Sequence, residues 1–235
     1  MVNRFILGLG VAFLVMVGLA VFWSSRHFDD SFRAGMVPVR MESNNGHTLL
    51  VSRFEVSVAS WRRCYEEKGC SFMPTAPAGG EKFPITGVNW FDVGEYVAWA
   101  NARSGGGLRL PTLAEWRELD RSLVKPKPAP YFTDPRLAWA AEYGQEKTPI
   151  GPVRASGSFS TTPDGISDLD GNVWEWTSSC YKPEFAAQNN NLCPAFVAAG
   201  AHEAVVSVFI RNPALGGCAT GAPPTHLGFR LVADR

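Results

Sequence analysis

The strongest feature of the hydrophobic pattern is an uninterrupted apolar run at residues 5 to 23, FILGLGVAFLVMVGLAVFW, which contains no charged residue. About 20 such residues suffice to cross a bilayer as a helix, so residues 1 to 26 are predicted to form a transmembrane helix. Arg4 precedes the run, and positive charge on this side keeps the N-terminus in the cytoplasm and exports the remainder.

A cleaved signal peptide is the alternative for the same segment, because Gly18-Leu19-Ala20 resembles a small-residue cleavage site. The uncleaved anchor is favoured because the apolar run is longer than the ~7–15 residues of a usual signal-peptide core. Both interpretations place the remainder outside the cytoplasm. The expected location is therefore an inner-membrane anchor that carries a domain in the periplasm or the extracellular space.

Strands are predicted at both ends of the exported part. Residues 36 to 56 indicate two short strands around Asn44-Asn45-Gly46, which is a hairpin signal. At the other end, His226 to Val232 alternates between apolar and polar positions and indicates a terminal strand.

Three helices are predicted between these strands. Ser57 is the expected N-cap of the first, and Gly69 is interpreted as the C′ residue that ends it. Asn89 is the expected N-cap of the second. Thr112 and Glu115 form the T-x-x-E capping box of the third. The second helix has an apolar stripe that is expected to be buried, formed by Trp90, Val93, Val97 and Ala100.

The remaining pattern indicates one loop-rich domain over residues 36 to 235. Residues 125 to 165 hold seven Pro and only weak periodicity, which is typical of a long loop. The chain has 23 Gly and 17 Pro among 235 residues. Their combined share is below the roughly 25–30% that indicates disorder.

The 22 basic and 22 acidic residues balance, and without residues 1 to 26 the counts are 20 and 22. A nucleic-acid partner is not expected, because phosphate binding needs a basic surplus.

The chain has five cysteines. Because the chain is predicted to be exported to an oxidising compartment, paired cysteines are expected to form disulfides. Local spacing favours the pairs Cys64 with Cys70 and Cys180 with Cys193, although four cysteines allow three connectivities. Cys218 is then left over. A zinc site is the weaker interpretation, because the chain has no CxxC motif and its four His are scattered.

Several short segments carry a family resemblance, in an order and spacing that cover about residues 36 to 235. They are Phe54 to Ser57, Val88 to Trp90 with Trp99, Arg109 to Trp116, Asp168 to Trp176 and Leu227 to Leu231. Together they resemble the sulfatase-modifying-factor family, whose founding activity is formylglycine generation. The resemblance implies an irregular α/β (α+β) domain of C-type-lectin-like topology with much loop, which agrees with the Gly and Pro content.

The Asp168 to Trp176 motif is interpreted mainly as architecture, with ligand contact as the alternative. Glu175 and Arg230 are the candidates for a buried ion pair, which is tolerable only when both groups are fully hydrogen-bonded. The family's second calcium site lies in this segment, and Asp168 and Asn172 offer the hard oxygens that calcium prefers. The equally weighted alternative is an Asx-turn without a metal.

The candidate catalytic segment departs from the family. The formylglycine-generating enzymes that the chain resembles hold copper(I) with two cysteines upstream of Gly-Phe-Arg, and soft thiolates select this ion. Here Val205 to Cys218 contains one cysteine, and Ile210-Arg211 is interpreted as the remnant of the family's Arg-Gly-Gly-Ser sequence. Cys218 is the candidate catalytic thiol and Arg211 a candidate binding residue. A buried or leftover role for Cys218 is favoured, and copper is not expected.

Two classes of function follow from the resemblance. The favoured one is a membrane-tethered accessory or binding factor for the maturation of an exported protein or enzyme, since some family members are accessory factors of copper nitrite reductases. The alternative is a metal-dependent oxidase that makes formylglycine on a sulfatase or carries out a related protein oxidation. A third interpretation, a carbohydrate-binding module, requires surface aromatics such as Tyr131, Phe132 and Tyr181 to stack on sugar.

Overall fold

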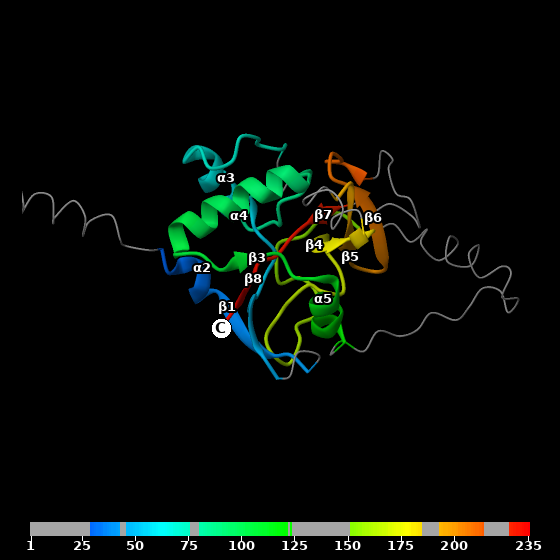
Figure 1. Cartoon of the computed structure of the whole chain (residues 1–235). Coiled ribbons are helices and arrows are strands. Elements are labelled where there is room, and N and C mark those ends of the chain that lie inside the picture. Colours follow the sequence, from blue (N-terminus) through cyan, green and yellow to red (C-terminus); the bar gives the residue numbers. More distant parts are fainter. Residues whose placement is uncertain are drawn as a thin grey trace, which may run out of the picture.

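The computed structural model describes residues 29–42, 46–75, 80–121, 123, 151–184, 193–213 and 226–235. Its strands form two four-stranded sheets (Figure 1). The first sheet has the order β1-β2-β8-β3, with β1 Met36–Arg40, β2 Thr48–Ser52, β8 Val232–Asp234 and β3 Leu108–Arg109. The second has the order β6-β5-β4-β7, with β6 Glu203–Ser207, β5 Ala195–Ala199, β4 Trp174–Cys180 and β7 Leu227–Gly228. The mixed α/β class expected from the sequence is confirmed.

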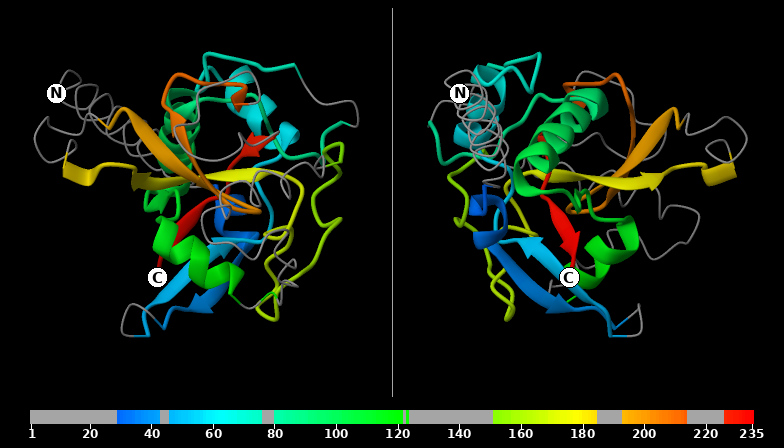
Figure 2. Two further views of the ribbon diagram at one scale, coloured as in Figure 1. Left: turned by 90° about the vertical axis from the view of Figure 1, so that its right-hand side faces the viewer. Right: turned by 60° about the vertical axis from the view of Figure 1, so that its left-hand side comes forward.

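The predicted N-terminal hairpin is present, with β1 and β2 antiparallel and Val37 opposite Val51. The predicted terminal strand is instead divided between two sheets. β7 pairs in parallel with β4, whereas β8 pairs with β2 and β3. Between them, the carbonyls of Phe229 and Leu231 accept hydrogen bonds from Val56 and Ser52. This segment therefore crosses from one sheet to the other (Figure 2).

The helices are α2 Ser31–Ala34, α3 Val58–Glu66, α4 Trp90–Ser104 and α5 Leu113–Asp120. All three predicted N-caps are confirmed. The Ser57 hydroxyl accepts from the Ser60 N–H at 3.2 Å. Asn89 begins a complete capping box with Asp92, and Thr112 begins another with Glu115. In Figures 1 and 2, α3 and α4 lie together on one side and α5 on the other.

The C-terminal end of α3 differs from the prediction. Lys68, not Gly69, occupies the left-handed C′ position, with φ 63°. The Lys68 N–H donates to the Tyr65 carbonyl and the Gly69 N–H to the Cys64 carbonyl, which is the hydrogen-bond pattern of a Schellman motif. Glycine is needed at position 69 for another reason, because a Cβ there would lie 2.3 Å from Cδ1 of Trp99.

The buried face of α4 also differs in part. Val93 and Ala100 are buried as predicted, but Trp90 and Val97 are only partly buried. The buried face instead includes Asp92, Tyr96 and Trp99. The buried face of α4 is therefore shifted from the predicted stripe toward Tyr96 and Trp99.

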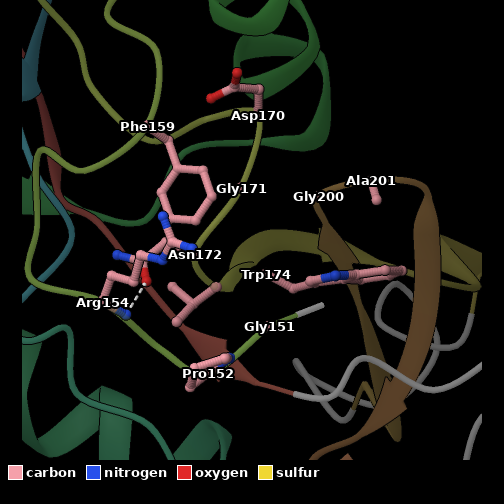
Figure 3. A pocket seen from close by; sticks show the side chains of 11 residues that line it. Gly151, Pro152, Arg154, Phe159, Asp170, Gly171, Asn172, Trp174, Gly200 and Ala201 are labelled. Atoms are coloured by element: carbon pink, nitrogen blue, oxygen red, sulfur yellow. Dashed lines mark hydrogen bonds between the residues drawn. The ribbon is translucent and has the colours of Figure 1, made fainter. Parts of the chain in front are cut away.

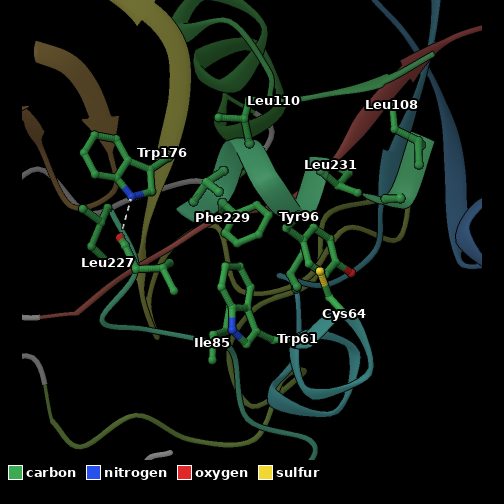
Figure 4. Packing of buried hydrophobic residues seen from close by; sticks show 14 of the residues in the cluster. Trp61, Cys64, Ile85, Tyr96, Leu108, Leu110, Trp176, Leu227, Phe229 and Leu231 are labelled. Atoms are coloured by element: carbon green, nitrogen blue, oxygen red, sulfur yellow. Dashed lines mark hydrogen bonds between the residues drawn. The ribbon is translucent and has the colours of Figure 1, made fainter. Parts of the chain in front are cut away.

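An aromatic cluster forms the centre of the main core (Figure 4). The Tyr96 ring stacks on Trp61 with ring centroids 5.5 Å apart, and Phe229 meets both rings edge to face. The three rings come from α4, α3 and the crossing between β7 and β8. A second core cluster surrounds Trp116 of α5 and the β1–β2 hairpin. Together these clusters hold the helices against both sheets.

The predicted membrane anchor at residues 1 to 26 lies outside the described residues. Within the described part, no helix has both the length and the apolar character needed to cross a bilayer. The division into an anchor and a domain at 36 to 235 stays a prediction.

Candidate functional site

A pocket of about 230 Å³ lies where the loop of residues 151–159 meets the first residue of β4 and the turn between β5 and β6 (Figure 3). Six of the side chains that shape it belong to Arg154, Phe159, Asn172, Val173, Trp174 and Ala201. Most of these side chains are apolar. The pocket therefore offers an apolar interior with a few polar groups, which is typical of a small-molecule site.

Two glycines set the aromatic walls of this pocket. A Cβ at Gly171 would lie 2.4 Å from Cδ1 of Phe159, and a Cβ at Gly200 would lie 2.7 Å from Cγ of Trp174. Each ring can therefore pack directly on backbone. The His202 ring meets Trp174 edge-on, with centroids 4.0 Å apart. The positions of Phe159 and Trp174 are thus set by close packing.

Two residues that line the pocket carry a buried N–H donor without an acceptor. The Asn172 Oδ1 accepts from the Arg154 N–H at 2.9 Å, whereas Asn172 Nδ2 is buried without an acceptor. The Nε1 of Trp174 is also buried and has no acceptor. The Arg154 guanidinium lies 5.6 Å from the centre of the Phe159 ring. Unsatisfied buried N–H groups are costly, so each of these two groups calls for an explanation.

Asp168 holds the loop that carries Phe159. Its fully buried carboxylate accepts from the Gly157 N–H at 2.5 Å and from the Phe159 N–H at 2.8 Å. Asp168 and Asn172 both have left-handed backbones, with φ 69° and 65°. The predicted metal-ligand residues are therefore anchors of the loop of residues 151–159.

These contacts fit calcium poorly. Both oxygens of Asp168 and the Oδ1 of Asn172 already accept backbone N–H groups, with which a cation would have to compete. Within the described ranges, no group of three or more His, Cys, Asp or Glu side chains is placed to hold a metal ion. Calcium stays a prediction, and no chemical step is derived through it.

The Glu175–Arg230 ion pair is present and buried. Arg230 Nε donates to both carboxylate oxygens of Glu175, at 2.9 and 2.7 Å, and Nη2 donates to Oε1 at 2.5 Å. The Trp116 Nε1 donates to the same carboxylate at 2.9 Å. Remaining Arg230 donors reach the carbonyls of Ser52 and Ser167. Because the pair is satisfied by protein groups and does not line the pocket, its geometry favours the architectural interpretation.

Glu55 is a buried carboxylate that the sequence interpretation missed. Only 4% of its surface is exposed, and neither carboxylate oxygen has a hydrogen-bond partner. Burial raises the pKa of Glu55 from 4.5 to about 8; Arg230 opposes this rise, whereas Glu175 and Asp168 add to it. The rise favours the protonated form of Glu55. The sequence feature that could have indicated Glu55 is its position in the Phe54 to Ser57 segment, which was used only as part of the family resemblance.

Arg211 connects the segment after β6 to the start of α4. Its Nε and Nη2 donate to the two carboxylate oxygens of Asp92, at 2.7 and 2.9 Å. Its guanidinium also lies 3.9 Å from the centre of the Phe72 ring. These contacts use Arg211 to tie two elements together, and Arg211 does not line the pocket. Its predicted binding role stays a prediction.

The cysteines form the two predicted disulfides, Cys64–Cys70 and Cys180–Cys193. Their Cα atoms are 5.3 and 5.8 Å apart, within the usual range for disulfides. Cys218, the candidate catalytic thiol, lies outside the described residues. The sequence has five cysteines, so these two bonds leave one thiol in the chain.

Of the predicted site residues, Asn172 lines the pocket. Asp168 does not line it but accepts a hydrogen bond from the backbone of Phe159, which does. Sequence reasoning missed Arg154 and Phe159, which lie in the Pro-rich stretch where no periodic pattern guides an assignment. It found Trp174 only as a structural residue.

The chain belongs to the family of the Sulfatase-modifying factor enzyme 1-like domain, whose profile matches residues 28–235. Among its relatives, the inactive C-alpha-formylglycine-generating enzyme 2 of Mus musculus is 35% identical over 127 residues, covering 47% of this chain and 38% of that protein. The formylglycine-generating enzyme of Streptomyces coelicolor is 29% identical over 126 residues, covering 49% and 38%. These matches each span less than two fifths of the relative's length.

The solved structure of PvdO from Pseudomonas aeruginosa has a TM-score of 0.54 with 18% sequence identity, and the match covers 81% of this chain and 82% of that one. This likeness concerns the fold.

Proposed function

We propose that this protein is a non-catalytic, ligand-binding member of the family, exported and tethered to the inner membrane, where it assists the maturation of an exported protein or enzyme. The observation that carries the proposal is the cysteine arrangement. Four of the five cysteines are in disulfides, which leaves one cysteine where the enzymes that the chain resembles hold copper(I) with a thiol pair.

Further support comes from the pocket and the compartment. The pocket wall has buried N–H donors without acceptors, which favours binding of a ligand. Two disulfides in one small domain are typical of an oxidising compartment and agree with export. The inactive enzyme 2 of Mus musculus is a precedent for a family member without the activity.

The test of catalysis is a copper titration of the full chain in detergent, under anaerobic conditions, with free thiols counted in parallel. One thiol per chain, no stoichiometric tight copper(I) and no formylglycine formed on a sulfatase peptide are expected. Cys218→Ser is the matched variant. Stoichiometric copper that is lost in Cys218→Ser would overturn the proposal and support the oxidase.

The test of location is protease accessibility. In intact spheroplasts that express the full chain, added protease is expected to degrade the domain. Protection until the membrane is lysed would contradict export.

A further inference from the structure

We propose that the pocket between Phe159 and Trp174 binds a carboxylate attached to an apolar group, as presented by the C-terminal residue of a polypeptide. This inference rests on the proposed function, because a non-catalytic maturation factor acts by binding. It adds the chemical class of the ligand.

The size and walls of the pocket define the apolar part of the ligand. A volume of about 230 Å³ is below the ~300–1,000 Å³ of sites for drug-sized molecules, so the pocket suits a group of amino-acid size. Apolar surface around it comes from Phe159, Trp174 and Ala201 (Figure 3) and from Val173. Packing of the two rings on glycines fixes the width of this space before a ligand binds. A preformed apolar space of this kind favours an apolar side chain.

The charge at the pocket defines the polar part. Arg154 is exposed, and in the described part of the chain its guanidinium pairs with no carboxylate. Its own backbone N–H is fixed by Asn172 Oδ1, so the residue is anchored while its charged end remains free. An arginine fork binds a carboxylate through two parallel hydrogen bonds. The pocket therefore has an exposed cation among the residues that line an apolar space.

Asn172 and Trp174 also line the pocket and carry buried, uncharged donors. Asn172 and Trp174 are 1% and 3% exposed, and each has an N–H group without an acceptor. The carboxylate of Asp170 is the adverse charge at the rim. One of its oxygens accepts from the Ser160 N–H at 3.2 Å, and Figure 3 shows the carboxylate directed away from Trp174.

Calorimetry on the full chain in detergent micelles tests this inference with N-acetyl-leucine and N-acetyl-leucinamide as probes. The acid is expected to bind at least about tenfold more tightly than the amide, because only the acid can form a charge-assisted hydrogen bond. Arg154→Gln should reduce the affinity for the acid by about tenfold and leave the amide unaffected. Arg121→Gln, which alters a highly exposed arginine on another face, is the matched control and should change neither.

A second variant tests the place of binding. Ala201→Phe adds a ring at the pocket wall and should abolish binding of the acid while the unfolding temperature stays close to that of the parent chain. A pentapeptide ending in leucine, with a free or an amidated C-terminus, distinguishes a polypeptide C-terminus from a small carboxylate as the ligand. Tighter binding of the free-ended peptide than of N-acetyl-leucine assigns the site to polypeptide ends, whereas equal binding assigns it to small carboxylates; both outcomes support the carboxylate chemistry.

Equal affinity for acid and amide, no binding of either, or binding unchanged in Arg154→Gln or in Ala201→Phe would overturn the inference. Failure here is distinct from failure of the proposed function. If the chain has one thiol, binds no copper and binds no carboxylate, the proposed non-catalytic function stands and only the proposed ligand is refuted. A chain that binds copper through Cys218 loses the proposed function, whatever its pocket binds.

Discussion

Arg230 and Glu175 join the two sheets through an ion pair that solvent does not reach. Glu175 belongs to β4 of the second sheet, and Arg230 lies between β7 and β8, where the chain enters the first sheet. Both residues are fully buried, and Arg230 Nε lies 2.9 and 2.7 Å from the two carboxylate oxygens of Glu175. Trp116 of α5 donates to the same carboxylate. The pair therefore specifies how the sheets and α5 meet.

Removing one charge of this pair is expected to destabilise the fold strongly. Glu175→Gln leaves the Arg230 guanidinium buried without a counter-charge, and breaking a buried pair in this way costs about 3–5 kcal/mol. Urea unfolding at neutral pH measures the change. Arg117→Gln is the control, because Arg117 pairs with Glu203 at the surface and such pairs contribute about 0–1 kcal/mol. Equal losses in both variants would refute the structural role of the buried pair.

Glu55 is expected to make the fold less stable as the pH rises. Its pKa is raised from 4.5 to about 8 in the folded chain by burial, so the folded chain holds a proton that the unfolded chain releases above about pH 4.5. The stability contributed by the protonated group is complete below pH 4.5, declines above it, and is lost as the pH passes through about 8. Each unit of pKa difference corresponds to about 1.4 kcal/mol, so the total reaches several kcal/mol.

The variant Glu55→Gln tests this dependence because glutamine is close in shape and does not titrate. The parent chain and the variant are compared by urea unfolding between pH 5 and 9, with Glu66→Gln, a change of an exposed glutamate, as the control. The stability of the variant relative to the parent should increase with pH over this range. A constant difference from pH 5 to pH 9 would show that Glu55 is not the titrating group.

Features that depend on neighbours in the sequence were predictable. The caps at Ser57, Asn89 and Thr112 are satisfied within three residues, and both disulfides close short loops. Features that depend on distant partners were not. Phe159 is placed by the carboxylate of Asp168 and by packing on Gly171, and no periodic pattern in its own loop indicates either contact. The pocket was not predicted because the contacts that place Phe159 involve residues outside its own loop.

The Glu175–Arg230 pair is an intermediate case. Its two residues are 55 positions apart, and their pairing was inferred from the need of a buried charge for a partner. Glu55 was missed because it lacks a partner, which leaves nothing in the sequence to mark it as buried. The charged groups that shift its pKa, Arg230, Glu175 and Asp168, come together only in the folded chain.

The disulfide between Cys180 and Cys193 should contribute about 3 kcal/mol to stability. It closes a segment of 13 residues, and in the chain-entropy account the bond restricts the unfolded chain by this amount. The double variant Cys180→Ser with Cys193→Ser is expected to unfold at lower urea concentration by that difference. Reduction of the double variant serves as the control, since any further loss then reports on Cys64–Cys70 alone. A double variant as stable as the parent would contradict the prediction.

The end of α3 offers two adjacent substitutions with opposite expected results. Gly69→Ala places a Cβ 2.3 Å from Cδ1 of Trp99 and should cost about 1–3 kcal/mol, because overpacking forces buried groups to shift. Lys68→Gly relieves the left-handed backbone of Lys68, with φ 63°, and should leave the stability unchanged or raise it by up to about 1 kcal/mol. Thermal and urea unfolding of the two variants compare them directly. If Gly69→Ala were harmless and Lys68→Gly costly, position 69 would not be the point of close contact with α4.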